Sequence, residues 1–279
     1  MHKAALYQRS NGLQRRDAKQ TIEEFSPAFQ WRSDGGDSLL DIGCGSGDVT
    51  VDLVLPILPV NFERLVGVDL SKEMIDFARK QYPDPRLSFE IFDLGVDLEK
   101  QALRHIDRFD HITSFYCLHW VQNQEIAIKN MYKLLKDEGD IFLVFLAQNP
   151  VFDIYKQLSQ SKKWAKYMTD VDRFISPYQY SKNPADELGK LLYSNGFTEY
   201  SVEVREKCFV FEGVDLLKRS VRAVNPFLER IAKQDQEAYL DDYINIVVQE
   251  QLALDDIHVN SNTCRFLAPY KLMIAYARK

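Results

Sequence analysis

Short apolar runs alternate with amphipathic segments through the first half of the chain. Five runs are almost wholly apolar, as is typical of strands covered on both faces: residues 38–43, 64–69, 87–92, 109–116 and 139–147. Segments with helical spacing follow the first four runs, at residues 48–59, 71–82, 97–106 and 123–135. Because strand and helix alternate, the pattern predicts a mostly parallel sheet with helices on both faces.

The two ends of the chain depart from this alternation. Residues 4–25 are expected to be helical, with a break at Asn11-Gly12. Residues 148–182 are irregular and rich in aromatic side chains. Later segments predict a helix, an antiparallel or edge strand, two or three helices and a last strand, at 185–196, 198–212, 214–259 and 270–279. Helices inserted between late antiparallel strands predict a cover over one end of the sheet.

Composition narrows the class of protein. The chain has 279 residues, of which 46% are hydrophobic and 27% charged, as in a globular protein. Its net charge of −6 argues against nucleic acid as the main partner. The four cysteines are widely spaced, without a CxxC pair or a Cys/His cluster, so we expect reduced thiols, no metal site and a cytoplasmic location.

The amino terminus lacks the apolar core of a signal peptide, and the apolar run at 141–147 is too short to span a bilayer. We therefore expect neither secretion nor a membrane span. The sequence leaves the assembly state open, with a homodimer among the alternatives.

The strongest chemical signal is a glycine-rich turn. Gly43, Gly45 and Gly47 lie directly after a predicted strand and before a predicted helix, where glycine lets the backbone approach a ligand closely. Asp69 ends the next strand, where an acid can accept both hydroxyls of a ribose. A dinucleotide or another adenosine-containing ligand would fit this much of the pattern.

Two observations separate these ligands. The third glycine comes one residue earlier than in the G-x-G-x-x-G pattern of dinucleotide sites. Asp41 and Asp48 flank the turn, and their carboxylates would repel a pyrophosphate but suit an ammonium or sulfonium group. An adenosine-containing ligand with an ammonium or sulfonium group is therefore favoured over a dinucleotide.

In "LDIGCGSG", "VGVDLSKEMI", "FEIFDL" and "FDHITSFYCLHW" the sequence resembles the Rossmann-like, S-adenosylmethionine-dependent methyltransferases. The resemblance implies an α/β fold of that type, with S-adenosylmethionine as cofactor and S-adenosylhomocysteine as product. It assigns Asp69 to the ribose, Asp93 to the adenine amino group and Met74 to the adenine face. The implied cofactor-binding residues are Asp41, Gly43, Cys44, Gly45, Gly47, Asp69, Leu70, Met74, Asp93, Leu94, Ser114 and Phe115.

A narrower resemblance rests on "LYQRSNGLQRRDA", on "LHWV" and on "NPF" at residues 225–227. These segments are similar to the insect juvenile hormone acid O-methyltransferases. The resemblance implies methyl esterification of an apolar isoprenoid acid, juvenile hormone acid or farnesoic acid, in juvenile hormone biosynthesis. It implies that Gln14 and Trp120 hold the substrate carboxylate. A similar layout in bacterial methyltransferases keeps a small or carrier-bound carboxylic acid as an alternative.

Methyl transfer to a carboxylate is chemically consistent with these two residues. A carboxylic acid is already ionised at neutral pH, so methyl transfer needs no general base. Both charges vanish as the ester forms, so neutral donors such as the Gln14 amide and the Trp120 indole N–H suit the transition state better than a cation. His119 is interpreted as a packing residue rather than a base. Tyr7 either closes over cofactor or substrate or simply packs.

We expect a single methyltransferase domain over residues 1–279. Within it we expect a helical lid at 1–30, a cofactor-binding core at 36–147, and substrate-cap insertions at 148–182 and 214–260. Aromatic residues between Phe152 and Tyr180 could roof an apolar tunnel. The competing hypothesis from another class is a non-catalytic module that binds S-adenosylmethionine.

Overall fold

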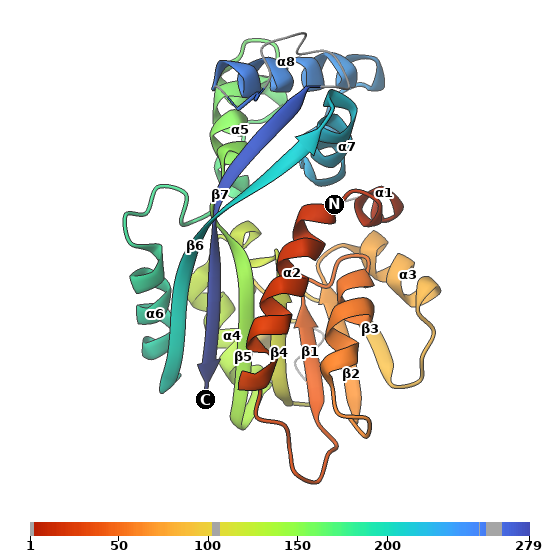
Figure 1. Ribbon diagram of the computed structural model, residues 1–279, viewed down its shortest axis with the longest axis vertical. Helices are drawn as coiled ribbons and strands as arrows, with labels where there is room; N and C mark the ends of the chain where they lie inside the picture. Colours follow the sequence, from red (N-terminus) through yellow and green to blue (C-terminus); the bar gives the residue numbers. More distant parts are fainter. Residues whose placement is uncertain (1–2, 102–106, 251, 255–263) are drawn as a thin grey trace.

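The computed structural model describes residues 3–101, 107–250, 252–254 and 264–279. A seven-stranded sheet has the order β3-β2-β1-β4-β5-β7-β6 (Figure 1). Its strands are β1 Ser38–Ile42, β2 Arg64–Asp69, β3 Leu87–Ile91, β4 Phe109–Phe115, β5 Leu135–Gln148, β6 Glu199–Glu212 and β7 Arg265–Arg278. β1 to β5 pair in parallel, and β7 pairs antiparallel with both β5 and β6. The predicted fold class is confirmed.

Eight α-helices lie in the described part of the chain. They are α1 Ala4–Gln8, α2 Gly12–Phe25, α3 Lys72–Gln81, α4 Gln124–Leu134, α5 Pro150–Gln160, α6 Pro184–Ser194, α7 Val214–Val224 and α8 Gln236–Gln249. The predicted break at Asn11-Gly12 is confirmed by the separation of α1 from α2. α3 begins where the Ser71 side chain accepts from the backbone N–H of Met74.

Two hydrophobic cores cover the two faces of the sheet. One face packs against α2, and this core continues into α5, α7 and α8. The other face packs against α4 and α6. In Figure 1, α2 crosses in front of the sheet. Helices on both faces explain why the parallel strands are apolar throughout, since β4 is buried along its whole length.

The late strands extend beyond the sheet and support a cap. β6 and β7 are each 14 residues long and stay paired from Glu199↔Arg278 to Glu212↔Arg265. Figure 1 shows α5, α7 and α8 gathered around their far ends, beyond the carboxyl ends of the parallel strands. Ligands collect at those carboxyl ends in open α/β sheets.

Two predicted elements differ from the structure in detail. The helix expected from Asp48 ends at Ile57 but is mostly irregular, with a π-helix at Thr50–Val54 and a 3-10 helix at Leu55–Ile57. Pro56 has no N–H to donate to an i−4 carbonyl, which explains the irregular end. The helix expected at 97–106 is a 3-10 turn at Leu98–Lys100, and residues 102–106 lie outside the described part of the chain.

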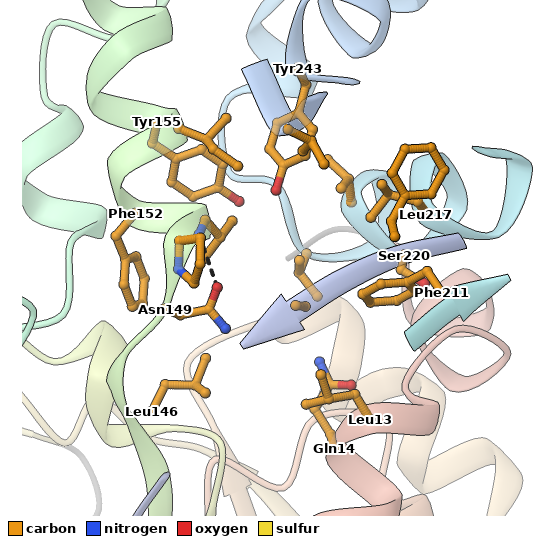
Figure 2. Close-up of a pocket in the computed structure, with 18 of the residues that line it drawn as sticks. Leu13, Gln14, Leu146, Asn149, Phe152, Tyr155, Phe211, Leu217, Ser220 and Tyr243 are labelled. Atoms are coloured by element: carbon orange, nitrogen blue, oxygen red, sulfur yellow. Dashed lines mark hydrogen bonds between the residues drawn. The ribbon is translucent and has the colours of Figure 1, made fainter. Parts of the chain in front are cut away.

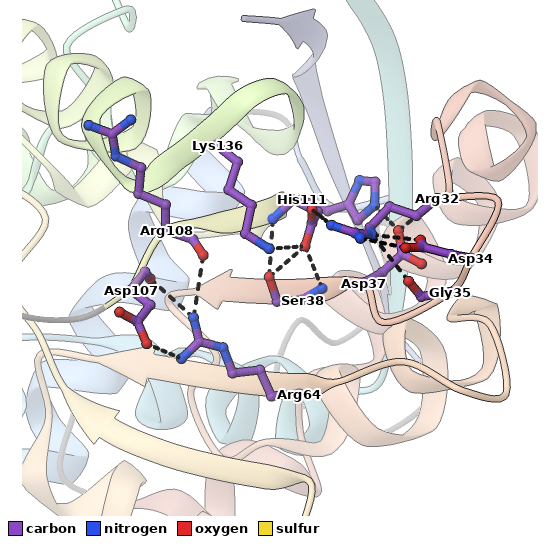
Figure 3. Close-up of polar contacts among 11 residues, drawn as sticks. Arg32, Asp34, Gly35, Asp37, Ser38, Arg64, Asp107, Arg108, His111 and Lys136 are labelled. Atoms are coloured by element: carbon purple, nitrogen blue, oxygen red, sulfur yellow. Dashed lines mark hydrogen bonds and ion pairs between the residues drawn. The ribbon is translucent and has the colours of Figure 1, made fainter.

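A polar cluster joins the amino ends of the strands, opposite the cap (Figure 3). The His111 imidazole lies between two carboxylates, with Nδ1 at 2.7 Å from Asp140 and Nε2 at 3.0 Å from Asp37. Asp110 accepts from Ser38 and Lys136 in the same cluster. Burial lowers the pKa of His111, but the two carboxylates outweigh burial, and its net pKa is raised above the usual 6.5.

Among the described residues, no helix combines the length and the apolar character that crossing a membrane requires.

Candidate active site

The glycine-rich turn after β1 is built from backbone conformations that favour glycine. The φ angles of Gly43, Gly45 and Gly47 are +77°, +55° and +82°. The N–H groups of Gly43 and Cys44 donate to the Val68 carbonyl at 2.7 and 3.0 Å, which ties the turn to the end of β2. A Cβ atom on Gly43 would lie 2.3 Å from the Cys117 Cβ. Glycine is therefore required at position 43 by the close packing of the turn against Cys117, and the approach to a ligand stays a prediction.

Asp69 stands beside this turn at the end of β2. Its carboxylate accepts from the N–H of Gly45 at 3.1 Å and of Ser71 at 2.8 Å. Burial raises its pKa. The next residue, Leu70, leaves 65% of its surface exposed although it is apolar. Met74 is fully buried one turn into α3.

The remaining residues predicted for the cofactor lie at the ends of β3 and β4. The Asp93 carboxylate accepts from Gly95 N–H at 2.9 Å, and the Leu94 carbonyl accepts from Asn130 at 3.0 Å. The Ser114 hydroxyl donates to the Ile42 carbonyl at 2.8 Å, so this side chain ties β4 to β1. Phe115 is buried at the end of β4. All twelve predicted residues thus lie along the carboxyl ends of β1 to β4.

The two acids that flank the turn differ in their partners. Asp41 is buried, and among the described residues its carboxylate accepts from two hydroxyls, Thr50 at 2.5 Å and Thr113 at 2.8 Å. Burial outweighs these bonds and raises the Asp41 pKa to about 6. Asp48, by contrast, pairs with Arg15 at 2.6 Å. The interpretation that both acids favour a cationic ligand therefore needs correction, because the Asp48 charge is already compensated.

A small cavity of about 330 Å³, its open mouth included, adjoins the turn. It lies between the turn, the end of β4 and the two amino-terminal helices. Its lining residues are Tyr7, Gln14, Asp41, Gly43, Cys44, Asp48, Val49, Phe115 and Tyr116. Tyr7 reaches over the turn, since a Cβ on Gly45 would lie 3.5 Å from the Tyr7 ring.

A larger cavity of about 1040 Å³, its open mouth included, lies under the cap (Figure 2). Its walls come from α2, α5, α7, α8 and β7, and most of the lining side chains are apolar. Tyr7, Gln14 and Tyr116 line both cavities. The two cavities are therefore neighbours that share these three side chains in their walls.

Gln14 and Trp120 both line the larger cavity. Gln14 lies in the first turns of α2, and Trp120 ends a 3-10 helix at Leu118–Trp120, just beyond β4. The Trp120 ring packs edge-on against Phe152, with ring centroids 6.0 Å apart. Within the described parts of the chain, neither the Gln14 amide nor the Trp120 indole N–H makes a hydrogen bond. The structure thus brings these two distant residues to one cavity with their donors available.

A buried network fixes α2 against the strands. Asp17, one turn after Gln14, is fully buried, and its carboxylate accepts from the hydroxyls of Tyr116 at 2.7 Å and Tyr270 at 2.6 Å. Lys207 pairs with the same carboxylate at 2.8 Å. Because Tyr116 also lines both cavities, this network sets the position of α2, and with it Gln14, relative to β4.

His119 is neutral in this site. Complete burial lowers its pKa to about 3. Its Nδ1 atom accepts from the Leu146 N–H at 3.4 Å, and its ring lies 4.7 Å from that of Trp120. This environment agrees with the interpretation of His119 as a packing residue.

Sequence reasoning missed three polar side chains of the larger cavity. The Ser10 and Tyr155 hydroxyls are buried and have no hydrogen-bond partner among the described residues, and Asn149 lines the same cavity. Ser10 precedes Gln14 by one helical turn, but the break at Asn11-Gly12 hides that spacing. Tyr155 lies in the aromatic segment expected to roof a tunnel, but nothing in the sequence singles out its hydroxyl, because its position depends on how α5 packs in the cap.

Known proteins resemble this chain at two levels. Residues 40–143 match the family model described as a methyltransferase domain. The YcgJ protein from Bacillus subtilis superposes with a TM-score of 0.59 at 16% identity, covering 93% of this chain and 98% of that one. This likeness concerns the fold alone.

Two relatives found by sequence have a much higher identity to this chain. Juvenile hormone acid O-methyltransferase of Drosophila melanogaster is 48% identical, over 100% of this chain and 93% of that protein. The protein of the same name from Bombyx mori is 41% identical, over 100% and 98%. With identity this high over the full length, the chain belongs to the juvenile hormone acid O-methyltransferase family of methyltransferases.

Proposed function

We propose that the protein transfers the methyl group of S-adenosylmethionine to the carboxylate of an apolar acid, juvenile hormone acid or a close isoprenoid relative. The observation that carries this proposal is that two neighbouring cavities share Gln14 in their walls. One adjoins the glycine-rich turn, and the other is large, apolar and covered by the cap. The family membership supports the same reaction.

The residues of the small cavity fit this cofactor. Asp41 is a buried carboxylate without a cationic partner among the described residues, so an ammonium group beside it would relieve the cost of its burial. Asp69 and Asp93 would bind the ribose and the adenine amino group, with Met74 and Leu70 beside the ring. Cys44, Leu94, Ser114 and Phe115 complete the proposed binding surface. When bound, the cofactor supplies the electrophilic methyl group.

The acid would enter the larger cavity with its carboxylate toward Gln14 and Trp120. Their N–H groups orient the carboxylate without adding a positive charge that would favour the ground state. The Ser10 hydroxyl, buried and unpartnered in the same cavity, would be a third neutral donor. His119 is neutral, and an ionised carboxylate needs no base. Catalysis then rests on positioning the two reactants.

The apolar walls would bind the remainder of the acid. Each buried methylene contributes about 0.8 kcal/mol, so a long isoprenoid chain could supply most of the binding energy. We assign residues 1–30 to a helical lid, 36–147 to the cofactor-binding core, and 148–182 and 214–260 to the substrate cap, all in one domain over residues 1–279; within these ranges, residues 1–2, 102–106, 251 and 255–263 lie outside the described part of the chain. A cytoplasmic location and a homodimer stay predictions from the sequence.

The test is a transfer assay with methyl-labelled S-adenosylmethionine and a panel of acids. The panel contains juvenile hormone acid, farnesoic acid, a straight-chain fatty acid and a short polar acid. We expect labelled methyl ester from the isoprenoid acids and little from the short acid. Label in the short acid alone would replace the proposed substrate class. Tight cofactor binding without label in any acid would favour a non-catalytic binding module.

A further inference from the structure

The Tyr155 hydroxyl is a buried polar group without a partner. Tyr155 lies on α5, is fully buried, and packs its ring edge-on against Phe227 with centroids 5.3 Å apart. None of the described groups forms a hydrogen bond with its hydroxyl. The Asn225 amide donates to the Tyr239 hydroxyl at 3.1 Å; it also lies close enough to Tyr155 to act on the pKa of that hydroxyl, but without the geometry of a hydrogen bond. An unpaired buried hydroxyl costs about 1–3 kcal/mol, so this one needs an explanation.

The position of the Tyr155 hydroxyl suggests why it has no partner in the protein. Tyr155 lines the larger cavity. In Figure 2 its hydroxyl points into the cavity interior near that of Tyr243, at the top of the view, whereas Gln14 lies at the bottom. Phe152, Leu217 and Val221 supply apolar wall around the same space. A ligand held at Gln14 by its carboxylate would therefore meet the hydroxyls of Tyr155 and Tyr243 toward its far end.

We propose that Tyr155 donates a hydrogen bond to an ether-type oxygen, such as an epoxide, on the chain of the acid and remote from its carboxylate. This inference rests on the proposed function and adds a specificity-determining residue to it. The bond would satisfy the orphan hydroxyl only when such an oxygen is present. A site built to hydrogen-bond a substrate oxygen discriminates strongly against an analogue that lacks it, because its own polar group is then left unpaired.

An ordered water is the competing explanation, since waters satisfy many buried hydroxyls. A water bound with every acid would make the hydroxyl equally useful for all of them. The two explanations therefore differ in one measurable quantity, the preference between two acids that differ only in the remote oxygen.

The experiment compares juvenile hormone acid, which carries the epoxide, with farnesoic acid, which has an alkene at that position. kcat/KM for both is measured with the wild-type protein and with Tyr155→Phe. We expect the wild type to prefer the epoxide by about tenfold or more. Tyr155→Phe should lose most of this preference, through a lower kcat/KM for the epoxide acid and an unchanged or higher value for the alkene acid.

Tyr239→Phe is the matched control. Tyr239 is also a buried tyrosine of the cap, but its hydroxyl already accepts from Asn225 and does not line the cavity. We expect this variant to change both kcat/KM values by the same factor. Thermal melting of both variants separates a loss of folding from a loss of selectivity, and calorimetric binding of each acid to the S-adenosylhomocysteine complex supplies a readout independent of turnover.

The outcomes are distinct. A wild-type preference that survives in Tyr155→Phe, or an equal loss for both acids, overturns the inference in favour of water or simple packing. Absence of any preference in the wild type also overturns it. Failure of the wild type to methylate either acid overturns the proposed function instead.

Discussion

At the residue scale, Asp41 is the buried acid beside the proposed cofactor site. Its carboxylate is buried between two threonine hydroxyls, and its pKa is raised to about 6. Ionisation of this group is therefore costly in the protein without ligand. A cationic ligand that binds beside it selects the ionised form, so binding and proton release are linked.

Asp41→Asn should weaken S-adenosylmethionine binding by roughly tenfold or more, because a hydrogen bond to a charged group contributes about 1.5–3 kcal/mol. The raised pKa of Asp41 means that the carboxyl is protonated below about pH 6 and ionised above it. The wild-type affinity should therefore fall as the pH drops below about 6, and that of Asp41→Asn should not. Calorimetric titrations between pH 5 and 8 measure both effects. An unchanged affinity in the variant would remove Asp41 from the site.

Gln14→Ala and Trp120→Phe should each lower kcat by on the order of 10- to 100-fold, because each removes one donor that orients the carboxylate. Cofactor binding should persist, since neither residue holds the cofactor in this account. Stopped-flow turnover and calorimetry measure the two properties separately.

Two substitutions serve as controls for this pair. Gln20 lies on the same helix as Gln14, and its side chain accepts from Lys207 outside both cavities. Trp31 stacks on Phe29 away from the site. Gln20→Ala and Trp31→Phe should leave kcat within about twofold of the wild type. Loss of cofactor affinity with normal turnover in Gln14→Ala would contradict its assigned role.

The sequence alone points to candidate residues whose position follows from their neighbours along the chain. The glycines of the turn and Asp69 follow from strand ends that can be read along the chain. Asp48 shows the limit, because its neutralising partner Arg15 comes from a helix that packs on the turn only in the folded protein. Tyr155 and Ser10 were missed for the same reason, since their hydroxyls become informative only when burial leaves them without partners.

At the scale of elements, the strand pattern and the presence of a cap were predictable, but the shape of the cap was not. β1 to β4 are short apolar runs bounded by polar residues, so the hydrophobic pattern is sufficient to predict these strands. β5 is longer than predicted because it already begins at Leu135, at the amino end of the sheet, and β7 is longer because it begins at Arg265, within the cap. The shape of the cap depends on aromatic packing between α5, α7 and α8, for which no short-range pattern exists.

The glycine-rich turn allows a test with a matched control. Gly43 and Gly36 have nearly equal φ angles, +77° and +76°, but only Gly43 lacks space for a Cβ. Gly36→Ala should destabilise the protein by about 1–2 kcal/mol through backbone strain alone. Gly43→Ala should cost about 1–3 kcal/mol more through overlap with Cys117. Urea denaturation measures the difference, and equal losses would mean that the turn has more room than the structure indicates.

At the scale of the whole molecule, the carboxyl and amino ends of the parallel strands carry different groups of residues. The carboxyl ends of the strands carry both cavities, and the amino ends carry the His111 cluster (Figure 3). His111 contacts Asp37, Asp140 and the ring of Trp31, and the Tyr276 hydroxyl also donates to Asp140 at 3.0 Å. Because this cluster joins β1, β4, β5 and β7, we interpret it as stabilising the fold and not as part of the reaction.

The His111 cluster predicts how stability depends on pH. The pKa of His111 is raised in the folded protein, so the folded state binds the proton more tightly than the unfolded chain. Its contribution is complete below the unfolded pKa of about 6.5 and is lost as the pH rises through the higher folded pKa. The melting temperature should fall over that range, and His111→Gln should flatten the fall. An equally steep fall in the variant would assign the pH dependence to other groups.

The most direct test of the central claim follows the labelled methyl group to its acceptor atom. The protein is incubated with methyl-labelled S-adenosylmethionine and, separately, with juvenile hormone acid, the corresponding alcohol and the corresponding amide, which keep the same apolar chain. We expect labelled methyl ester from the acid and no labelled product from the alcohol or amide, because only the carboxylate is ionised without a base. Label in the alcohol or amide, or none in the acid, would contradict it.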